Sequence, residues 1–148
     1  MRELCSRFLF FCVLSFAFAA IAQAQSPDKK SLWKPVEFAI VKFNEEAPNS
    51  WNLYHTEKRG FLLVRLWKRY MLLDLNEEEV YDIDPHKIKT QGDGLEWNLA
   101  EAPDQPIEIS EWKSRNVGNV ERIRFRFGKN GHFFEMQIPL RPDGKSLY

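Results

Sequence analysis

The stretch from Ile123 to Ile138, IRFRFGKNGHFFEMQI, constrains the fold more than any other. Apolar residues alternate with arginines before an Asn-Gly pair and return after it, a pattern typical of two antiparallel strands that bury one face. Asn130 and Gly131 both tolerate the positive φ that the central residues of a type I′ turn require. With that turn, the apolar residues face one another across the hairpin: Phe127 opposite Phe134, Phe125 opposite Met136, and Ile123 opposite Ile138. We therefore expect these six side chains to face the core.

The same register places three arginines on the opposite face, Arg122, Arg124 and Arg126, about 7 Å apart in succession. Arg126 would lie opposite Glu135, whereas Arg124 would face the neutral Gln137 and Arg122 would face Pro139. Such a row is either a solvated surface or a docking strip for an acidic group, such as a phosphate or a carboxylate. The partner would then be an acidic envelope component or another exported protein.

Short runs rich in β-branched and aromatic residues recur through the rest of the chain. They cover residues 36–43, 51–55, 61–67, 70–75, 80–84, 95–99 and 107–113. The polar segments between them contain glycine, proline and asparagine, which are typical turn formers. The spacing predicts an all-β fold, a single antiparallel meander sandwich or small barrel of about seven to nine short strands.

One segment, 61–75, also fits an amphipathic helix. The residues that recur there at helical spacing are Leu63, Leu66, Trp67, Tyr70 and Leu73. Two strands are the favoured interpretation, because Gly60 opens the segment and no N-cap residue stands beside it.

The first 24 residues have the order of a secretory signal. Arg2 and Arg7 precede an apolar run over residues 8–18, and Ala22-Gln23-Ala24 supplies the small residues of a cleavage site. The run is shorter than the roughly 18–20 residues that span a bilayer, so we expect cleavage after Ala24 rather than an uncleaved anchor. Cleavage after Ala22 fits the same rule. The expected organisation is a signal peptide at 1–24, a polar linker at 25–35, an antiparallel β domain at 36–140 and a C-terminal tail at 141–148.

Both cysteines, Cys5 and Cys12, lie inside this signal. The processed chain would have no disulfide and no cysteine-based metal site, which is typical of bacterial periplasmic or secreted proteins rather than small eukaryotic ones. Removing 24 of the 148 residues leaves 124, with 19 basic and 20 acidic side chains. This balance argues against a nucleic-acid partner, and we expect no transmembrane segment after cleavage.

No pattern of residues indicates catalysis, a metal site or a cofactor. His55, His86 and His132 lie in separate segments, at no ligand spacing. Neither a G-x-S-x-G nor an S-x-x-K motif occurs, and the glycines form no phosphate-binding loop. Asp82 and Asp84 stand in a carboxylate-rich stretch that lacks an ordered calcium loop. We therefore predict no catalytic residue, no metal ligand and no cofactor.

The stretch RLWKRY at residues 65–70 interleaves basic and aromatic residues, as ligand-binding patches do. Its candidate binding residues are Trp67, Arg69 and Tyr70. A bend in a sheet with basic side chains extended into solvent explains the same pattern. The five tryptophans are expected mostly in the core, although exposed rings on a sheet would resemble a sugar-binding platform.

Together these observations predict an exported, non-catalytic β domain that acts as a binding or envelope-associated module. The alternative is a barrel that carries a small apolar ligand in its interior, and an enzyme of unrecognised type is the third possibility. An interior ligand is disfavoured, because protein interiors leave few voids larger than a water molecule.

Overall fold

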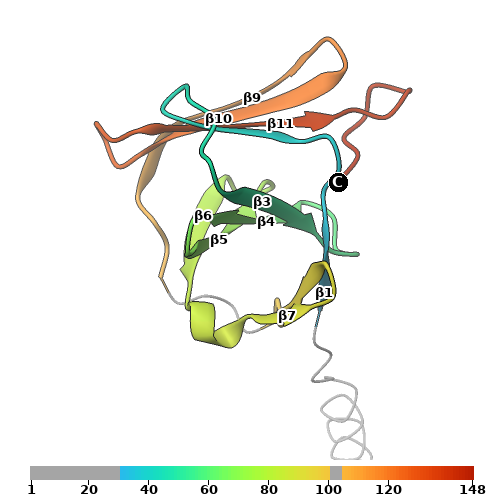
Figure 1. Cartoon of the computed structure of the whole chain (residues 1–148). Helices are drawn as coiled ribbons and strands as arrows, with labels where there is room; N and C mark the ends of the chain where they lie inside the picture. Colours follow the sequence, from blue (N-terminus) through green and yellow to red (C-terminus); the bar gives the residue numbers. More distant parts are fainter. Residues whose placement is uncertain (1–30, 101–104) are drawn as a thin grey trace, which may run out of the picture.

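The computed structural model describes residues 31–100 and 105–148, which form two antiparallel sheets (Figure 1). The predicted signal peptide and its cleavage site lie outside the described residues. The strands are β1 (Leu32–Pro35), β2 (Ile40–Phe43), β3 (Trp51–His55), β4 (Phe61–Leu66), β5 (Arg69–Asp74), β6 (Glu79–Ile83), β7 (Lys89–Gln91), β8 (Gly94–Glu96), β9 (Ile109–Val117), β10 (Val120–Phe127) and β11 (Phe133–Pro139). A 3₁₀ turn, η1 (Pro85–Lys87), follows β6. The all-β antiparallel prediction is confirmed.

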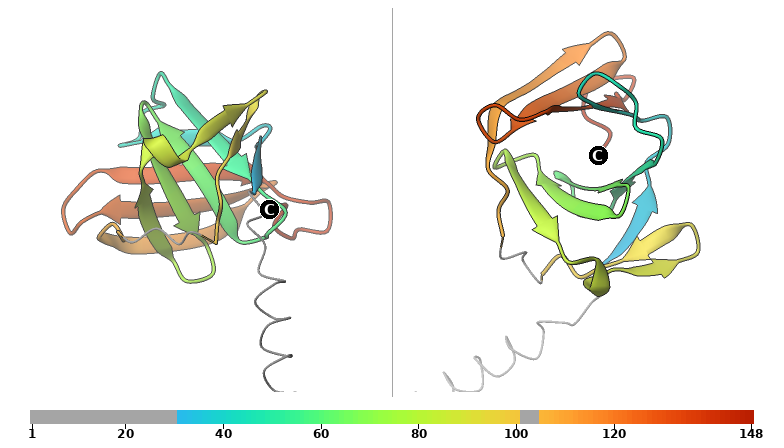
Figure 2. Two further views of the ribbon diagram at one scale, coloured as in Figure 1. Left: turned by 90° about the horizontal axis from the view of Figure 1, so that it is seen from below. Right: turned by 60° about the vertical axis from the view of Figure 1, so that its left-hand side comes forward.

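The two sheets differ in shape. The larger sheet has seven strands in the order β6-β5-β4-β3-β1-β8-β7, and it curls into a half-barrel (Figure 2). The smaller sheet has the order β2-β11-β10-β9 and lies across the outer side of the curl (Figure 1). Four strands have only three or four residues, which is why the described chain contains more strands than the sequence predicts.

The central strands β3, β4 and β5 are buried on both faces. One core fills the space between the sheets, and its largest buried side chains include Leu53, Phe125, Phe134 and Met136. A second core fills the inside of the curl and consists of Trp33, Tyr54, Leu63, Leu72, Ile83, Leu95 and Trp97. Burial on both faces gives near-continuous apolar runs, which is why residues 61–75 also matched helical spacing. The strands are confirmed here, and the helical alternative is wrong.

Residues expected in the linker form a strand of the larger sheet. β1 pairs with β3 on one side and with β8 on the other. Trp33 is fully buried, and its indole N–H donates a hydrogen bond of 3.1 Å to the carbonyl of Trp97. The strand expected at 36–43 is correspondingly shorter, because residues 36–39 form a turn through which the chain passes from the larger sheet to the smaller. Phe38 lies in this turn with a φ of 59°.

The residues predicted as a C-terminal tail fold back on the domain. Leu140 forms an isolated β-bridge with Ser146, and the ring of Tyr148 lies 4.5 Å from that of His55.

The hairpin of β10 and β11 has the expected faces but a different register. Phe125 lies opposite Phe134 rather than Met136, and Ile123 lies opposite Met136 rather than Ile138. Because the shift is two residues, each side chain keeps its face. Of the six apolar residues assigned to the core, only Phe127 is not fully buried.

The turn of this hairpin explains the shift. Its loop has four residues, Gly128 to Gly131, and is closed by a hydrogen bond of 3.1 Å from the Phe127 N–H to the His132 carbonyl. The positive φ falls on Gly128, not on the Asn130-Gly131 pair. Gly131 instead allows the backbone to pass close to the carbonyl oxygen of Phe127, with which a Cβ at this position would collide.

Candidate functional site

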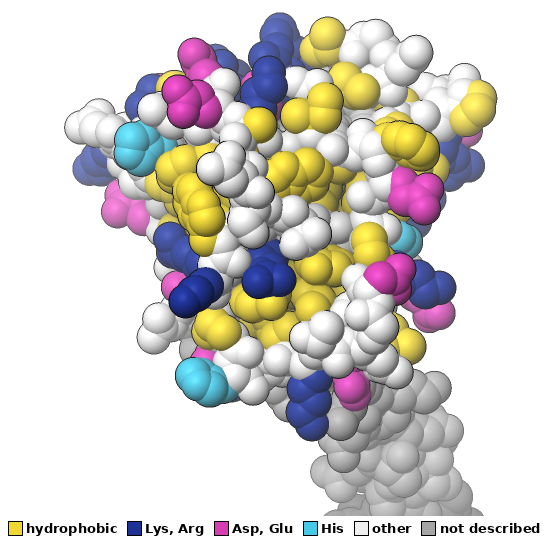
Figure 3. All heavy atoms as spheres, viewed as in Figure 1, with side chains coloured by type: hydrophobic (Ala, Val, Ile, Leu, Met, Phe, Trp, Pro, Cys, Tyr) yellow, Lys and Arg dark blue, Asp and Glu magenta, His cyan; other side chains and the backbone are white. Residues whose placement is uncertain are grey.

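A cleft of about 460 Å³ opens between the two sheets, beside the turn that joins β4 to β5. Its apolar walls are Phe43, Leu66, Trp67, Met71, Ile107 and Phe127. Arg69, Glu108 and His132 add polar groups to the lining. We call this feature the Trp67 cleft. Figure 3 shows hydrophobic side chains reaching the surface along the flank between the sheets, on the left of the view.

Trp67 holds an unusual backbone conformation. It is the first residue of a two-residue turn between Leu66 and Arg69, and its φ is 55°. Glycine normally occupies such positions, because a bulky side chain is strained at positive φ. The surroundings hold the residue in place: its carbonyl accepts a hydrogen bond of 3.0 Å from Arg65 Nε, and its ring meets that of Phe43 edge-on at 5.7 Å. The indole is nevertheless half exposed, at 50%.

Both sheets contribute walls, so the cleft is formed before any ligand arrives. Phe43 from β2 lies at the centre of an aromatic group, 6.0 Å from the ring of Phe127 and 5.3 Å from that of His132. Ile107 is fixed by a hydrogen bond of 2.8 Å from its N–H to the carbonyl of Val80. Preformed, mostly apolar hollows with a few polar groups are typical of small-molecule sites.

A second hollow, of about 630 Å³, lies on the other side of Trp67 at the end of the half-barrel. It includes Arg69, which forms an ion pair of 3.1 Å with Asp82. Trp97 also lines it, and the buried indole nitrogen of that residue has no hydrogen-bond partner among the described residues. Its rim contains Gln105, next to residues 101–104, which lie outside the described part of the chain. The walls of the Trp67 cleft are all described, and that cleft is the candidate site.

Two of the six candidate residues come together in this cleft. Trp67 and Arg69 line it, whereas Tyr70 packs against the core inside the curl, with its ring 5.8 Å from the guanidinium of Arg65. The other three candidates, Arg122, Arg124 and Arg126, lie on the outer face of the smaller sheet.

Each of these three arginines has a carboxylate partner, which corrects the prediction that only Arg126 would have one. Arg122 binds Glu135 at 2.7 Å, Arg124 binds Glu45 at 3.5 Å, and Arg126 binds Glu111 at 2.9 Å. The changed register places Glu135 opposite Arg124 and diagonally next to Arg122, to which it binds. A bulge in β9 at Glu111, which has a φ of 57°, places that residue beside Arg126. The guanidinium groups of Arg124 and Arg126 also stack on the ring of Phe133, at 3.9 and 3.7 Å.

Glu135 is the one fully buried charged residue among those described. Burial acts to raise the pKa of its carboxyl group, but the hydrogen bonds from Arg122 and Gln137 outweigh burial, so its pKa is lowered. The carboxylate therefore stays ionised and ties β10 to β11 on the outer face.

Sequence reasoning missed most walls of the cleft, including Phe43, Ile107 and Phe127. Each was assigned to a strand, but only the packing of the two sheets brings them to Trp67. Among residues 31–100 and 105–148, no group of three or more His, Cys, Asp or Glu side chains is placed to hold a metal ion. In the same part of the chain, no helix has the length and apolar character needed to cross a membrane. Comparison of the chain with known families, curated proteins and solved structures gave no match.

Proposed function

We propose that the protein is an exported, non-catalytic binding domain whose ligand enters the Trp67 cleft. The observation that carries this proposal is a half-exposed tryptophan held at positive φ on the wall of an apolar cleft. Strained residues persist where the surrounding structure holds them, and they cluster at functional sites. The cleft volume of about 460 Å³ also falls within the range of roughly 300–1,000 Å³ that is usual for small-molecule sites.

The chemistry of the walls favours a small ligand with an apolar or aromatic body. Four of the six apolar wall residues offer aromatic rings or a methionine, which pack against flat or flexible groups: Phe43, Trp67, Met71 and Phe127. Arg69 and His132 provide donors for one polar or acidic end of such a ligand.

The cleft replaces the barrel interior as the expected position of an apolar ligand. Inside the curl, the rings of Trp33 and Trp97 lie 6.0 Å apart and pack with the five other buried residues of that core. A ligand there would have to displace the core. Between the sheets it would contact side chains that are already partly open to solvent.

A dye titration tests the proposal. N-phenyl-1-naphthylamine, a small aromatic probe, should bind the protein saturably with one site per chain. Trp67→Gly removes the indole yet suits the positive φ, and it should weaken binding at least tenfold while the protein remains folded. Phe38→Asn is the matched control, since it removes an even more exposed aromatic residue, also at positive φ, outside the cleft. Absence of saturable binding, or binding that survives Trp67→Gly, would contradict the proposal.

A further inference from the structure

On the outer face of the smaller sheet, positively charged side chains lie opposite one another on neighbouring strands, although the fold does not require such pairs. Arg122 lies directly opposite Arg115, and Arg124 lies directly opposite Lys113. Like charges in such pairs destabilise a sheet. Arg122 and Arg124 have carboxylate partners, but Lys113 and Arg115 are exposed and form no ion pair among the described residues. Lys113 and Arg115 thus present positive charge to solvent without an ion-pair partner of their own among the described residues.

The whole face has an excess of positive charge. Its basic side chains are Lys42, Lys113, Arg115, Arg122, Arg124 and Arg126, and its acidic partners are Glu45, Glu111 and Glu135. The complete chain has equal numbers of basic and acidic residues, 21 of each. The excess of three positive charges on this face is therefore matched by an excess of three negative charges over the rest of the chain.

Exposed apolar side chains border the basic rows at one end of the sheet. Ile40 is 46% exposed and lies opposite Gln137, in the row that contains Arg122 and Arg115. Val117 is 43% exposed at the end of β9, two residues beyond Arg115 and on the same face. Phe38, two residues before Ile40, is 87% exposed.

We propose that this face docks on an anionic lipid bilayer. Lys113 and Arg115 would meet lipid phosphates, while Phe38, Ile40 and Val117 would enter the headgroup region. Basic and apolar side chains together are what binds a protein to the surface of an anionic bilayer, and each basic residue there strengthens binding about fivefold. An acidic polymer would satisfy the cations but would leave the apolar side chains exposed, so the bilayer accounts for both features.

Docking in this manner leaves the Trp67 cleft accessible. The cleft is lined by Phe127 and Gly128, at the end of β10, whereas Val117 lies beside the start of β10 at Val120. The two ends of this strand are about 23 Å apart at the usual rise per residue. The bilayer proposal therefore does not depend on the proposed ligand site, and either can fail alone.

Vesicle sedimentation tests the proposal, using exported protein whose N-terminus is known from its intact mass. The protein should sediment with vesicles of phosphatidylglycerol and phosphatidylcholine at low ionic strength, and 0.5 M salt should release most of it. It should stay in solution with vesicles of phosphatidylcholine alone. Any contribution of the N-terminal segment is common to all variants.

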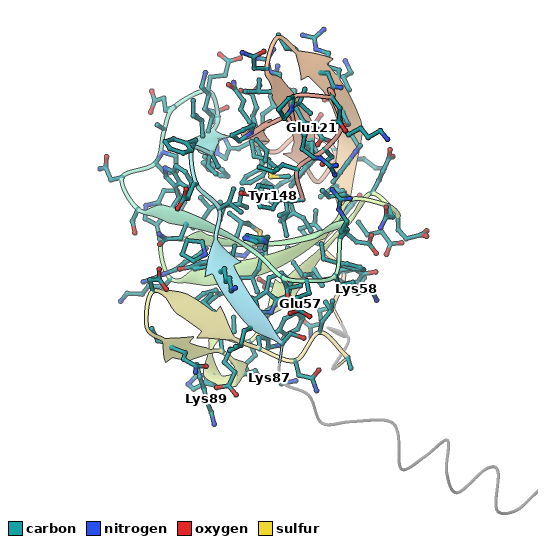
Figure 4. The ribbon with its side chains drawn as sticks, turned by 90° about the vertical axis from the view of Figure 1, so that its right-hand side faces the viewer. Glu57, Lys58, Lys87, Lys89, Glu121 and Tyr148 are labelled. Atoms are coloured by element: carbon teal, nitrogen blue, oxygen red, sulfur yellow. The ribbon has the colours of Figure 1, made fainter. Side chains whose placement is uncertain are left out.

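The double variant Lys113→Gln/Arg115→Gln removes two cations without breaking an ion pair. It should weaken binding to the anionic vesicles about 25-fold, at about fivefold for each residue. Lys87→Gln/Lys89→Gln is the control, because it causes the same change of charge at exposed positions. Figure 4 shows Lys87 and Lys89 at one end of the molecule and Glu121, a residue of β10, at the other. Phe38→Asn, which suits the positive φ, should weaken binding further.

Three results would overturn the proposal. The wild-type protein could fail to bind the anionic vesicles at low salt. The control pair could weaken binding as much as the test pair. Finally, soluble polyphosphate could bind as tightly as the vesicles while Phe38→Asn has no effect on vesicle binding, which would assign the face to an acidic polymer.

Discussion

Replacing Trp67 by alanine and, separately, by glycine measures the strain in the turn between β4 and β5. Both variants lose the same indole, so both lose its packing on Phe43, an edge-on contact worth about 0.5–1.5 kcal/mol. Burial of the covered half of the ring adds about 1 kcal/mol. We therefore expect each variant to be less stable than the wild type by about 2 kcal/mol before backbone effects are included.

The backbone separates the two variants. Alanine keeps a Cβ at the φ of 55°, where a residue other than glycine costs roughly 1–2 kcal/mol. Glycine relieves that strain but loses about 0.5–1 kcal/mol more conformational freedom on folding. Trp67→Gly should therefore be more stable than Trp67→Ala by about 0.5–1 kcal/mol, which corresponds to about 2–5 °C in Tm.

Urea and thermal unfolding, followed by the fluorescence of the four remaining tryptophans, measure this difference. Lys89, an exposed strand residue that is not among those with positive φ, provides the control pair. There the order should reverse, with alanine more stable than glycine. If Trp67→Ala is as stable as Trp67→Gly, the turn stores no strain, and the conformation of Trp67 is no sign of a binding site.

Three further predictions concern other parts of the chain. Trp33→Ala should cost about 3–5 kcal/mol in urea unfolding, because the ring is fully buried; no effect would mean that residues 32–35 are a linker after all. The lowered pKa of Glu135 means that its ionised form stabilises the fold above about pH 4.3 and that this contribution disappears as the pH falls through the folded-state pKa. Glu135→Gln should therefore reduce stability at pH 7 by about 1–3 kcal/mol and flatten the acid limb of the stability profile, and an unchanged acid limb would count against the Arg122 contact. The intact mass of exported protein should correspond to a chain that begins at Gln25, whereas a membrane-bound species with residues 1–24 would contradict cleavage.

Patterns of side-chain polarity predicted which face each residue of the hairpin occupies, but not the register. Alternation along β10 and β11 is a local property, so it assigned Phe125 and Phe134 to the core correctly. The register depends on how the loop closes, which is determined by contact between Gly131 and the carbonyl of Phe127. A glycine can serve either a positive φ or a close approach, and the dipeptide Asn-Gly does not reveal which applies.

Other differences come from contacts between residues that are distant in the chain. The polar run at residues 25–33, with Pro27, favours a linker, yet β1 is held in the larger sheet by its pairing with β3 and β8 and by the burial of Trp33. One wall of the cleft could be predicted, because basic and aromatic residues alternate around Trp67 and Arg69. The opposite wall, formed by Phe43 and Phe127, depends on the packing of two sheets.

Six residues other than glycine have a positive φ among those described, and just two of them are aromatic, Phe38 and Trp67. Phe38 is 87% exposed and Trp67 is 50% exposed, and each belongs to a different one of the two proposed binding surfaces. Neither exposure nor positive φ stabilises a folded aromatic residue, so their combination at both positions is better explained by binding than by folding. If so, the two substitutions should separate cleanly: Trp67→Gly should abolish dye binding and leave vesicle binding unchanged, whereas Phe38→Asn should do the opposite. A variant that impairs both activities equally would indicate a shared loss of structure, which a wild-type far-UV circular dichroism spectrum at the assay temperature would exclude.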